Sequence, residues 1–266
     1  GDLIFLAQDG IRTLSASEQY GDVQFGNVAR KIDPIVKALL AGIKGFVVSS
    51  SVFRLKNQYR LFYTRDGNEL DNQVGISGTL KQDNQGNVGW QWNTLEGMDV
   101  ACLESISNSF QDGTDYEKHY HGQYDGQIAL HDSGSDFDGT DIRAVLELNE
   151  IDYGDIGRRK TVHYVRVFGD VEEATIDEVI MEVAYDFGDV ATAQPGPYTL
   201  SDLGGIAGYG TALFGTATFG GQADFSNRVL VDGSGYSTKF KFRSEGMGGP
   251  YSINSLYVDL RMGPQL

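Results

Sequence analysis

Short apolar runs rich in β-branched and aromatic residues recur along the chain, separated by Gly, Asp and Asn. Three Asp-Gly pairs lie between such runs, at Asp9-Gly10, Asp66-Gly67 and Asp125-Gly126. Each pair predicts a β-hairpin, because a type I′ turn requires positive φ at both central residues. The pairs are 57 and 59 residues apart. This near-constant spacing indicates repeated antiparallel units, of which propeller blades are one kind.

Two longer segments, residues 161–168 and 179–187, alternate with a period of two and are predicted to be strands. In the first, Val162, Tyr164 and Arg166 are expected on one face and His163, Val165 and Val167 on the other. In the second, the odd-numbered positions from Val179 to Phe187 form the apolar face. Further strands are predicted at residues 229–231, 239–243 and 253–262.

One segment, residues 33–41, is predicted to be a short helix. Asp33 is suited to the N-cap, Pro34 to the first helical position and Gly42 to the C-terminal stop. An apolar stripe runs between them, formed by Ile35, Val36, Leu39 and Leu40. The predicted fold class is therefore mainly β, with antiparallel sheets arranged as propeller-like blades, a β-sandwich or both, and one short helix.

A change of composition at residues 132–140 predicts a domain boundary. Residues 1–131 are expected to form a hairpin-rich region, a partial propeller, and residues 132–266 a second β domain. The second domain contains a Gly-rich segment at residues 204–221, which is either a loop or an arm that pairs with a neighbouring subunit. Its aromatic residues are candidate oligomer contacts: Tyr209, Phe214 and Phe219.

The 266 residues carry 21 basic and 37 acidic side chains, a formal net charge of −16. The excess is concentrated in residues 61–157, whose balance is −15. This sign disfavours nucleic-acid binding through a basic surface. The acidic stretch is either a solvated face or a surface that binds cations or repels another polyanion. The single Cys excludes an intramolecular disulfide, and no apolar run or N-terminal pattern predicts a membrane helix or a secretory signal.

Four acids at residues 132–141 have the density of a calcium loop: Asp132, Asp136, Asp138 and Asp141. The EF-hand register fails, because it places Val145 where the closing Glu is required. A non-standard calcium site and turn-forming Asp residues remain as alternatives. The same run is close to the Asp-box motif of sialidase-like propellers, but Asp141 stands where that motif has an aromatic residue.

Two pairs at i, i+2 are candidate binding residues. His119 and His121, with His131 nearby, are either zinc ligands or solvent-facing strand residues. Trp90 and Trp92 are either a sugar-stacking platform or anchors of a core or interface.

Motifs for nucleophilic catalysis and nucleotide binding are absent from the sequence. It contains no G-x-S-x-G elbow, P-loop or dinucleotide fingerprint, and Cys102 is predicted to be a buried thiol. Paired carboxylates for glycoside hydrolysis stay open, because the sequence fixes no distance between acids. We therefore expect a non-enzyme without a cofactor or a bound metal.

Several segments occur in the order found in one family of viral proteins. The segments are residues 1–14 (GDLIFLAQDGIRTL), 57–63 (NQYRLFY), 132–142 (DSGSDFDGTDI), Arg159-Lys160, 185–188 (YDFG), 243–245 (RSE) and 250–253 (PYSI). This ordered set resembles the tail tubular, or nozzle, proteins of short-tailed bacteriophages.

The resemblance implies a virion protein, often built around a β-propeller, that is assembled in the host cytoplasm into a ring, commonly a hexamer. The ring would lie below the portal and adaptor, contact neighbouring tail proteins and form the conduit through which DNA leaves the particle. No catalytic residues come with the family. Its members are usually much longer than 266 residues, so the resemblance implies a fragment or a shorter related tail protein.

An acidic lumen suits a conduit, because it avoids the attraction between phosphates and basic side chains. The candidate channel-facing acids are Asp112, Asp115, Glu117, Asp136 and Asp138. Two other functions are compatible with the sequence. One is a carbohydrate-binding or carbohydrate-degrading β-protein, such as a phage depolymerase or a propeller glycosidase, and the other is a calcium-stabilised adhesion module.

Overall fold

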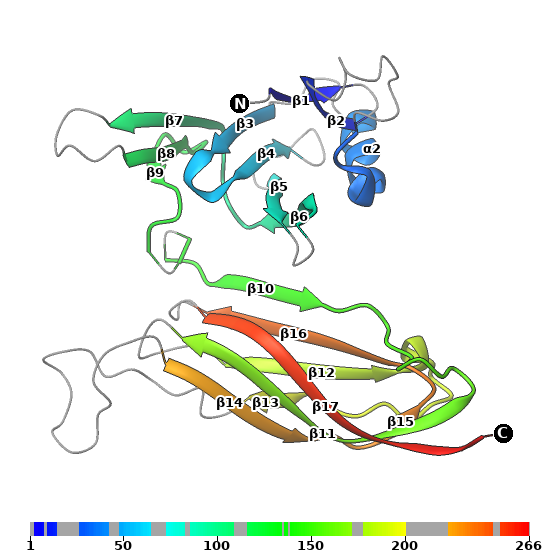
Figure 1. Cartoon of the computed structure of the whole chain (residues 1–266). Coiled ribbons are helices and arrows are strands. Elements are labelled where there is room, and N and C mark those ends of the chain that lie inside the picture. Colours follow the sequence, from blue (N-terminus) through cyan, green and yellow to red (C-terminus); the bar gives the residue numbers. More distant parts are fainter. Residues whose placement is uncertain are drawn as a thin grey trace, which may run out of the picture. The chain divides into compact units, whose positions relative to one another are not determined.

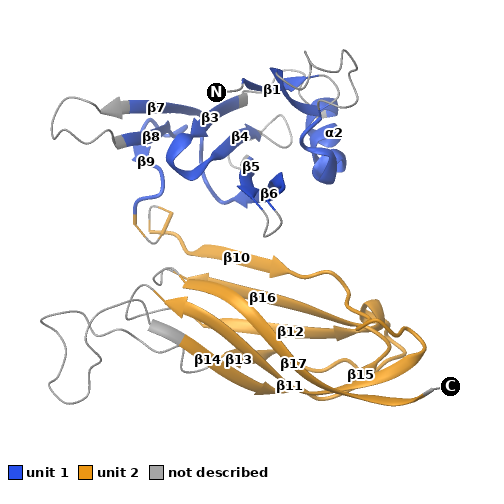
Figure 2. Cartoon of the chain, viewed as in Figure 1, with its two compact units in different colours: residues 1–133 blue, residues 134–266 orange. Residues whose placement is uncertain are grey.

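A computed structural model describes most of the chain. The described residues are 3–7, 10–14, 27–42, 48–64, 73–82, 86–108, 116–134, 136–137, 139–171, 178–200, 223–246 and 251–265. They form antiparallel sheets and one α-helix, which confirms the predicted mainly β class. The chain divides into two compact units, residues 1–133 and residues 134–266 (Figure 2). The sequence had placed the boundary after residue 131.

Unit 1 opens with the first predicted hairpin, formed by β1 (Ile4–Ala7) and β2 (Gly10–Thr13) (Figure 1). Ala7 pairs with Gly10, so Gly10 is the first residue of β2 and not a central turn residue. Its φ of 147° favours Gly at this position.

The predicted helix is α2 (Asp33–Gly42), which the chain enters through a 3-10 turn, η1 (Arg30–Ile32). Because of this turn, Asp33 already has helical angles, φ −46° and ψ −43°, and is not the extended N-cap that the sequence predicted. Its carboxylate accepts a hydrogen bond from Asn27 Nδ2 at 2.9 Å and lies 3.0 Å from Lys37 Nζ. The apolar stripe buries Val36 and Leu39, as expected.

Two antiparallel meanders follow in unit 1. The first has the order β3 (Val48–Phe53), β4 (Gln58–Thr64), β5 (Gln73–Gln82) and β6 (Val88–Glu96), with η2 (Arg54–Lys56) between β3 and β4. The second consists of β7 (Cys102–Asn108), β8 (Tyr116–Gly122) and β9 (Ile128–Leu130). The three Asp-Gly pairs thus belong to sheets of two, four and three strands. Among the described residues, their spacing does not mark a repeated unit.

The later two Asp-Gly connections differ from two-residue type I′ loops. Asp66-Gly67 falls outside the described residues, between Thr64 and Gln73, which pair at the end of the β4–β5 hairpin. In the β8–β9 connection, Gln123 N donates to Gln127 O at 2.9 Å, and Gly126 has a φ of 91°. Three residues therefore make this turn, and Gly126 supplies its left-handed position.

Unit 1 has two clusters of buried apolar side chains. One lies between β2, α2 and the four-stranded sheet and includes Ile11, Val36, Leu39, Tyr59, Leu61 and Ile76. The other contains Phe53, Phe62, Val100 and Leu103. The second cluster joins the two sheets, because Phe53 and Phe62 belong to β3 and β4 while Leu103 belongs to β7.

Gly78 in β5 makes room for the indole of its cross-strand partner Trp92. A Cβ at this position would lie 2.6 Å from Trp92 Cη2. We expect Gly78→Ala to lower the free energy of unfolding of unit 1 by about 2 kcal/mol, because the indole must be displaced. Urea unfolding followed by tryptophan fluorescence measures this change. Gly89→Ala in β6 is the matched control, since a Cβ there meets nothing within 4 Å; equal losses for both variants would contradict the packing argument.

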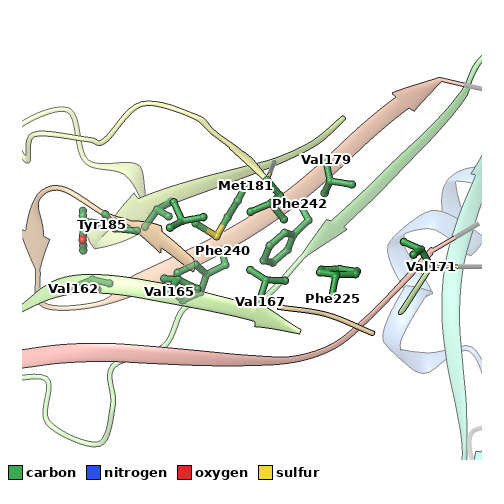
Figure 3. Packing of buried hydrophobic residues seen from close by; sticks show 14 residues of the cluster. Val162, Val165, Val167, Val171, Val179, Met181, Tyr185, Phe225, Phe240 and Phe242 are labelled. Carbon is green, nitrogen blue, oxygen red and sulfur yellow. The ribbon is translucent and has the colours of Figure 1, made fainter. Parts of the chain in front are cut away.

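Unit 2 contains two four-stranded antiparallel sheets. The first has the order β10 (Ile142–Glu147), β16 (Thr238–Gly246), β12 (Val179–Tyr185) and β13 (Tyr198–Leu200). In the second, β11 (Arg158–Val171) pairs with β14 (Ala223–Leu230), β15 (Ser234–Gly235) and β17 (Tyr251–Gln265). Apolar side chains from both sheets fill the space between them, which gives a β-sandwich core (Figure 3). The largest fully buried members are Met181, Tyr185, Phe240 and Phe242.

The long strand β11 has a different facing pattern from the one predicted. Val162, Val165 and Val167 are all buried, although the sequence placed Val162 on the opposite face from the other two. The cause is a register shift against β17 between Val162 and Tyr164, which inserts His163 as an extra residue. A bulge of this kind reverses the alternation downstream of it.

The strand β12 follows the predicted alternation as far as its end. Val179, Met181, Val183 and Tyr185 are buried, which confirms the expected face. Phe187 does not continue it, because the chain turns into η3 (Asp186–Gly188), where Phe187 has a φ of 60° and is 82% exposed. No helix among the described residues is long and apolar enough to cross a membrane.

Candidate functional site

Two of the sequence motifs meet in unit 1 through an ion pair. Arg60, in the NQYRLFY segment, donates to Asp132, the first residue of the DSGSDFDGTDI segment, through two nitrogens at 3.0 and 2.9 Å. Lys56 Nζ lies 2.7 Å from the same carboxylate. The guanidinium also lies 4.0 Å from the centre of the Phe53 ring. Burial raises the pKa of Asp132, but the hydrogen bonds from Arg60 and Lys56 outweigh it and hold the pKa below its usual value.

Two other motifs meet in unit 2 at the turn between β15 and β16. Lys160 is fully buried, and its Nζ donates to the carbonyl oxygens of Asp155 and Tyr236. Asp186 accepts hydrogen bonds from the backbone nitrogens of Tyr236, at 2.6 Å, and Ser237, at 3.2 Å. The ammonium and the carboxylate therefore fix the carbonyl and the amide of the same residue.

The last two motifs are joined to each other. Ser244 Oγ and Tyr251 OH are 2.8 Å apart. Beside them, Arg243 Nε donates to Glu182 at 2.8 Å, and this hydrogen bond contributes most to holding the pKa of Glu182 below its usual value. The polar residues of the motifs thus connect strands and turns to one another.

The sequence identified these motif segments but not the contacts between them. Arg60 and Asp132 are 72 positions apart, so their pairing depends on how the two sheets of unit 1 pack. The sequence did contain a local signal for Lys160. It stands two residues before the core residue Val162 in the same strand, so both side chains are expected on the buried face.

Of the five candidate channel-facing acids, two lie in the described residues, and both are hydrogen-bonded within the fold. Glu117 in β8 is 11% exposed, and its carboxylate accepts hydrogen bonds from Arg54 N and Ser105 Oγ. Asp136 is half-buried and accepts a hydrogen bond from Gly139 N at 2.7 Å, which makes it a turn-forming residue. The other three, Asp112, Asp115 and Asp138, lie outside the described residues.

No calcium or zinc site is formed by the part of the chain that the structure describes. There, no three His, Cys, Asp or Glu side chains are grouped so that they could hold a metal ion. Asp132 is bound by two cations of unit 1, and Asp136 is bound by a backbone amide in a turn of unit 2.

The three histidines of unit 1 are buried, whereas the sequence had favoured strand residues that face solvent. His119, His121 and His131 are 8%, 6% and 6% exposed. The rings of His121 and His131 are 4.5 Å apart, and His119 stacks on Phe53 at 3.6 Å. The sequence placed His119 and His121 on one strand face, but the packing of β3 and β4 decides that this face is covered.

Trp90 and Trp92 act as anchors of the core in unit 1. Their rings are stacked at 5.4 Å, and both pack against the cluster beneath β2 and α2. Trp92 Nε1 donates to Val28 O at 3.0 Å. Both side chains are half-buried, and the polar edge of Trp92 is used within unit 1.

Cys102 is exposed, which corrects the prediction of a buried thiol. Its neighbour Leu103 is buried instead, because successive residues of a strand point to opposite faces.

Unit 2 has an apolar groove of about 540 Å³ along one open edge of the sandwich. It lies between β10 and β16 of one sheet and β17 of the other, and its lining includes Leu146, Leu148, Phe242, Ile253, Leu256 and Val258. The candidate oligomer contacts Tyr209, Phe214 and Phe219 lie outside the described residues.

Comparisons with known proteins leave the family open. No protein-family model and no curated protein matches the chain. A crystal structure of the infectious bursal disease virus VP2 subviral particle matches 81% of this chain and 70% of its own, with 8% identity and a TM-score of 0.19. A structure of the Gx strain of that virus matches 71% of this chain and 42% of its own, with 12% identity and a TM-score of 0.17. Similarity at this level carries no argument about function.

Proposed function

We propose that this chain is a structural protein of a virion, and that it is a subunit of the ring-shaped tail tube or nozzle of a short-tailed bacteriophage. The observation that carries the proposal is the ordered set of sequence motifs, which spans both units. The contacts of these motifs support a structural role. Arg60 binds Asp132, and Ser244 binds Tyr251. Lys160 and Asp186 both bind the backbone of Tyr236. We therefore assign no catalytic role and no cofactor to the chain.

The charge of the chain is compatible with a wall along which DNA slides. Seven acids of the central stretch are exposed in the described residues: Glu96, Glu104, Asp125, Asp132, Asp141, Glu147 and Asp152. With a net charge of −16, the chain repels the phosphates of DNA and does not retain the duplex. We propose that part of the surface of residues 61–157 faces the channel. Glu117 contributes little to that surface, because its carboxylate is bound within unit 1.

Assembly into a ring requires surfaces that join subunits. The Gly-rich segment of residues 204–221 remains the proposed assembly arm, and the open apolar edge of unit 2 is exposed beside β10 and β17. The carbohydrate alternative gains no support, since the indoles that motivated it pack on the core of unit 1.

The assembly proposal predicts an oligomer of defined mass. In mass photometry, the full chain is expected to give one species several times heavier than its 29.1 kDa monomer. Deleting residues 204–221 is expected to leave only monomers with an unchanged circular dichroism spectrum. A deletion variant that still forms the oligomer would contradict the role of the arm, and a full chain that stays monomeric would contradict assembly by this chain alone.

A further inference from the structure

Three of the four histidines of the chain lie between the two sheets of unit 1. His119 and His121 project from β8, and His131 follows β9, with its backbone nitrogen bound to His119 O at 2.8 Å. The opposing sheet contributes aromatic rings to the same space: the ring of Phe53 lies 5.7 Å and that of Phe62 lies 5.8 Å from the His131 ring. We call these three residues the histidine cluster.

One ring nitrogen of each imidazole is buried without a hydrogen-bond partner. These atoms are His119 Nδ1, His121 Nδ1 and His131 Nε2. A neutral imidazole has one donor and one acceptor, whereas a protonated one has two donors. Protonation would therefore give each ring a buried charge and two N–H donors, and one of the two has no acceptor.

Arg60 makes the protonation of His131 especially unfavourable. Its Nη1 lies 3.3 Å from His131 Nδ1. A guanidinium can only donate, so Nδ1 must accept, and the ring is neutral with its proton on Nε2. A second proton on Nδ1 would set two donors against each other beside a positive charge.

The charges around the cluster balance only while the imidazoles are neutral. The facing cations are Arg54 and Lys56 of η2 and Arg60 of β4, and the facing anions are Asp99, Glu117 and Asp132. Asp132 binds Arg60 and Lys56, and Glu117 accepts from Arg54 N and lies 3.4 Å from His119 Nε2. Asp99 accepts from Tyr124 N through one oxygen, while its Oδ1 is buried without a partner. Any proton taken up by the cluster therefore creates an excess positive charge.

From this geometry, we propose that the histidine cluster is an acid-sensitive latch, which holds the β7–β9 sheet against the β3–β6 sheet when neutral and releases it when protonated. The inference is independent of the tail-tube proposal, because it concerns contacts inside one unit. The released state would expose the apolar contact of Phe53, Phe62, Val100 and Leu103.

The direction of the pH dependence follows from the pKa values. Burial lowers the pKa of each of the three imidazoles, that of His131 to about 3. A histidine in the open chain has a pKa of about 6.5, so the open state binds protons more readily. The stabilisation is complete above about pH 6.5 and is lost as the pH falls below it. From pH 7.5 to 5.5, each imidazole that stays neutral when closed favours opening about tenfold.

Tryptophan fluorescence can follow this opening in unit 1 alone, because Trp90 and Trp92 are the two tryptophans of the chain. We expect the urea midpoint of unit 1 to fall between pH 7.5 and pH 5.5, where carboxylates stay ionised. His131→Gln keeps an acceptor for Arg60 but cannot take up a proton. In this variant, the change of the unfolding equilibrium constant between pH 7.5 and pH 5.5 should be about tenfold smaller. His163→Gln is the matched control, since His163 is exposed in unit 2, and it should leave the change intact.

An NMR titration of the four imidazoles tests the latch without any variant. The three imidazoles of the histidine cluster are expected to stay neutral until unit 1 opens. Three buried imidazoles that titrate near pH 6.5 in the closed unit would overturn the proposal. So would a urea midpoint of unit 1 that is the same at both pH values.

Discussion

Replacing Gly169 with alanine is expected to lower the free energy of unfolding of unit 2 by about 3 kcal/mol, at the upper end of what overpacking costs. Gly169 is near the C-terminal end of β11, where it pairs with Phe225 of β14 on one side and Ile253 of β17 on the other. A Cβ would overlap the carbonyl oxygen of Ser252 and lie 2.5 Å from the Phe225 ring. Backbone cannot yield as a flexible side chain does, so β17 must move.

Gly196→Ala is the control for this variant, because a Cβ at Gly196 of the same unit meets nothing within 4 Å. Chemical unfolding followed by circular dichroism measures both. The control is expected to stay within about 0.5 kcal/mol of the parent chain. If Gly169→Ala were equally stable, the close approach of β17 to β11 at this residue would be contradicted.

Removing the carboxylate of Asp132 is expected to destabilise unit 1 by about 3 kcal/mol, because it leaves the guanidinium of Arg60 buried without its partner. The side chain of Arg60 is only 9% exposed and that of Asp132 is 31% exposed. Urea unfolding of Asp132→Ala, followed by tryptophan fluorescence, measures the loss. Since the pKa of Asp132 lies below its ordinary value of 3.8, the stabilisation is complete at neutral pH and is lost as the pH falls below that value.

Glu96→Ala is the matched control for Asp132→Ala, since it removes an exposed acid of the same unit. This control separates the buried ion pair from the general effect of reducing the negative charge. It is expected to change the stability by less than about 0.5 kcal/mol. Equal effects of the two substitutions would show that the Arg60–Asp132 pair does not hold the junction of the two motifs.

The sequence predicted individual strands well where local alternation decides them. β12 is the clearest case, because its buried residues follow one period from Val179 to Tyr185. In β11, local alternation was not sufficient. The bulge at His163 arises from pairing with β17, about a hundred positions later, and no local sequence pattern indicates it. The turn at Phe187 similarly depends on Asp186, whose carboxylate binds the β15–β16 turn.

Candidate sites were harder to predict, because burial depends on which sheets meet. The spacing of His119 and His121 gave a shared face, but only the contact with Phe53 makes that face an interior one. The prediction for Cys102 was wrong for the same reason, since its apolar neighbour Leu103 points to the other side of β7. The motif segments were visible in the sequence, whereas the pairing of Arg60 with Asp132 needed the folded chain.

Negative-stain electron microscopy of the purified full chain at neutral pH tests the tail-tube proposal. We predict closed rings, with a central hole wide enough for duplex DNA. Rings that form but have no such hole would contradict the conduit. A chain that remains monomeric, or that forms only open aggregates, would contradict the ring itself.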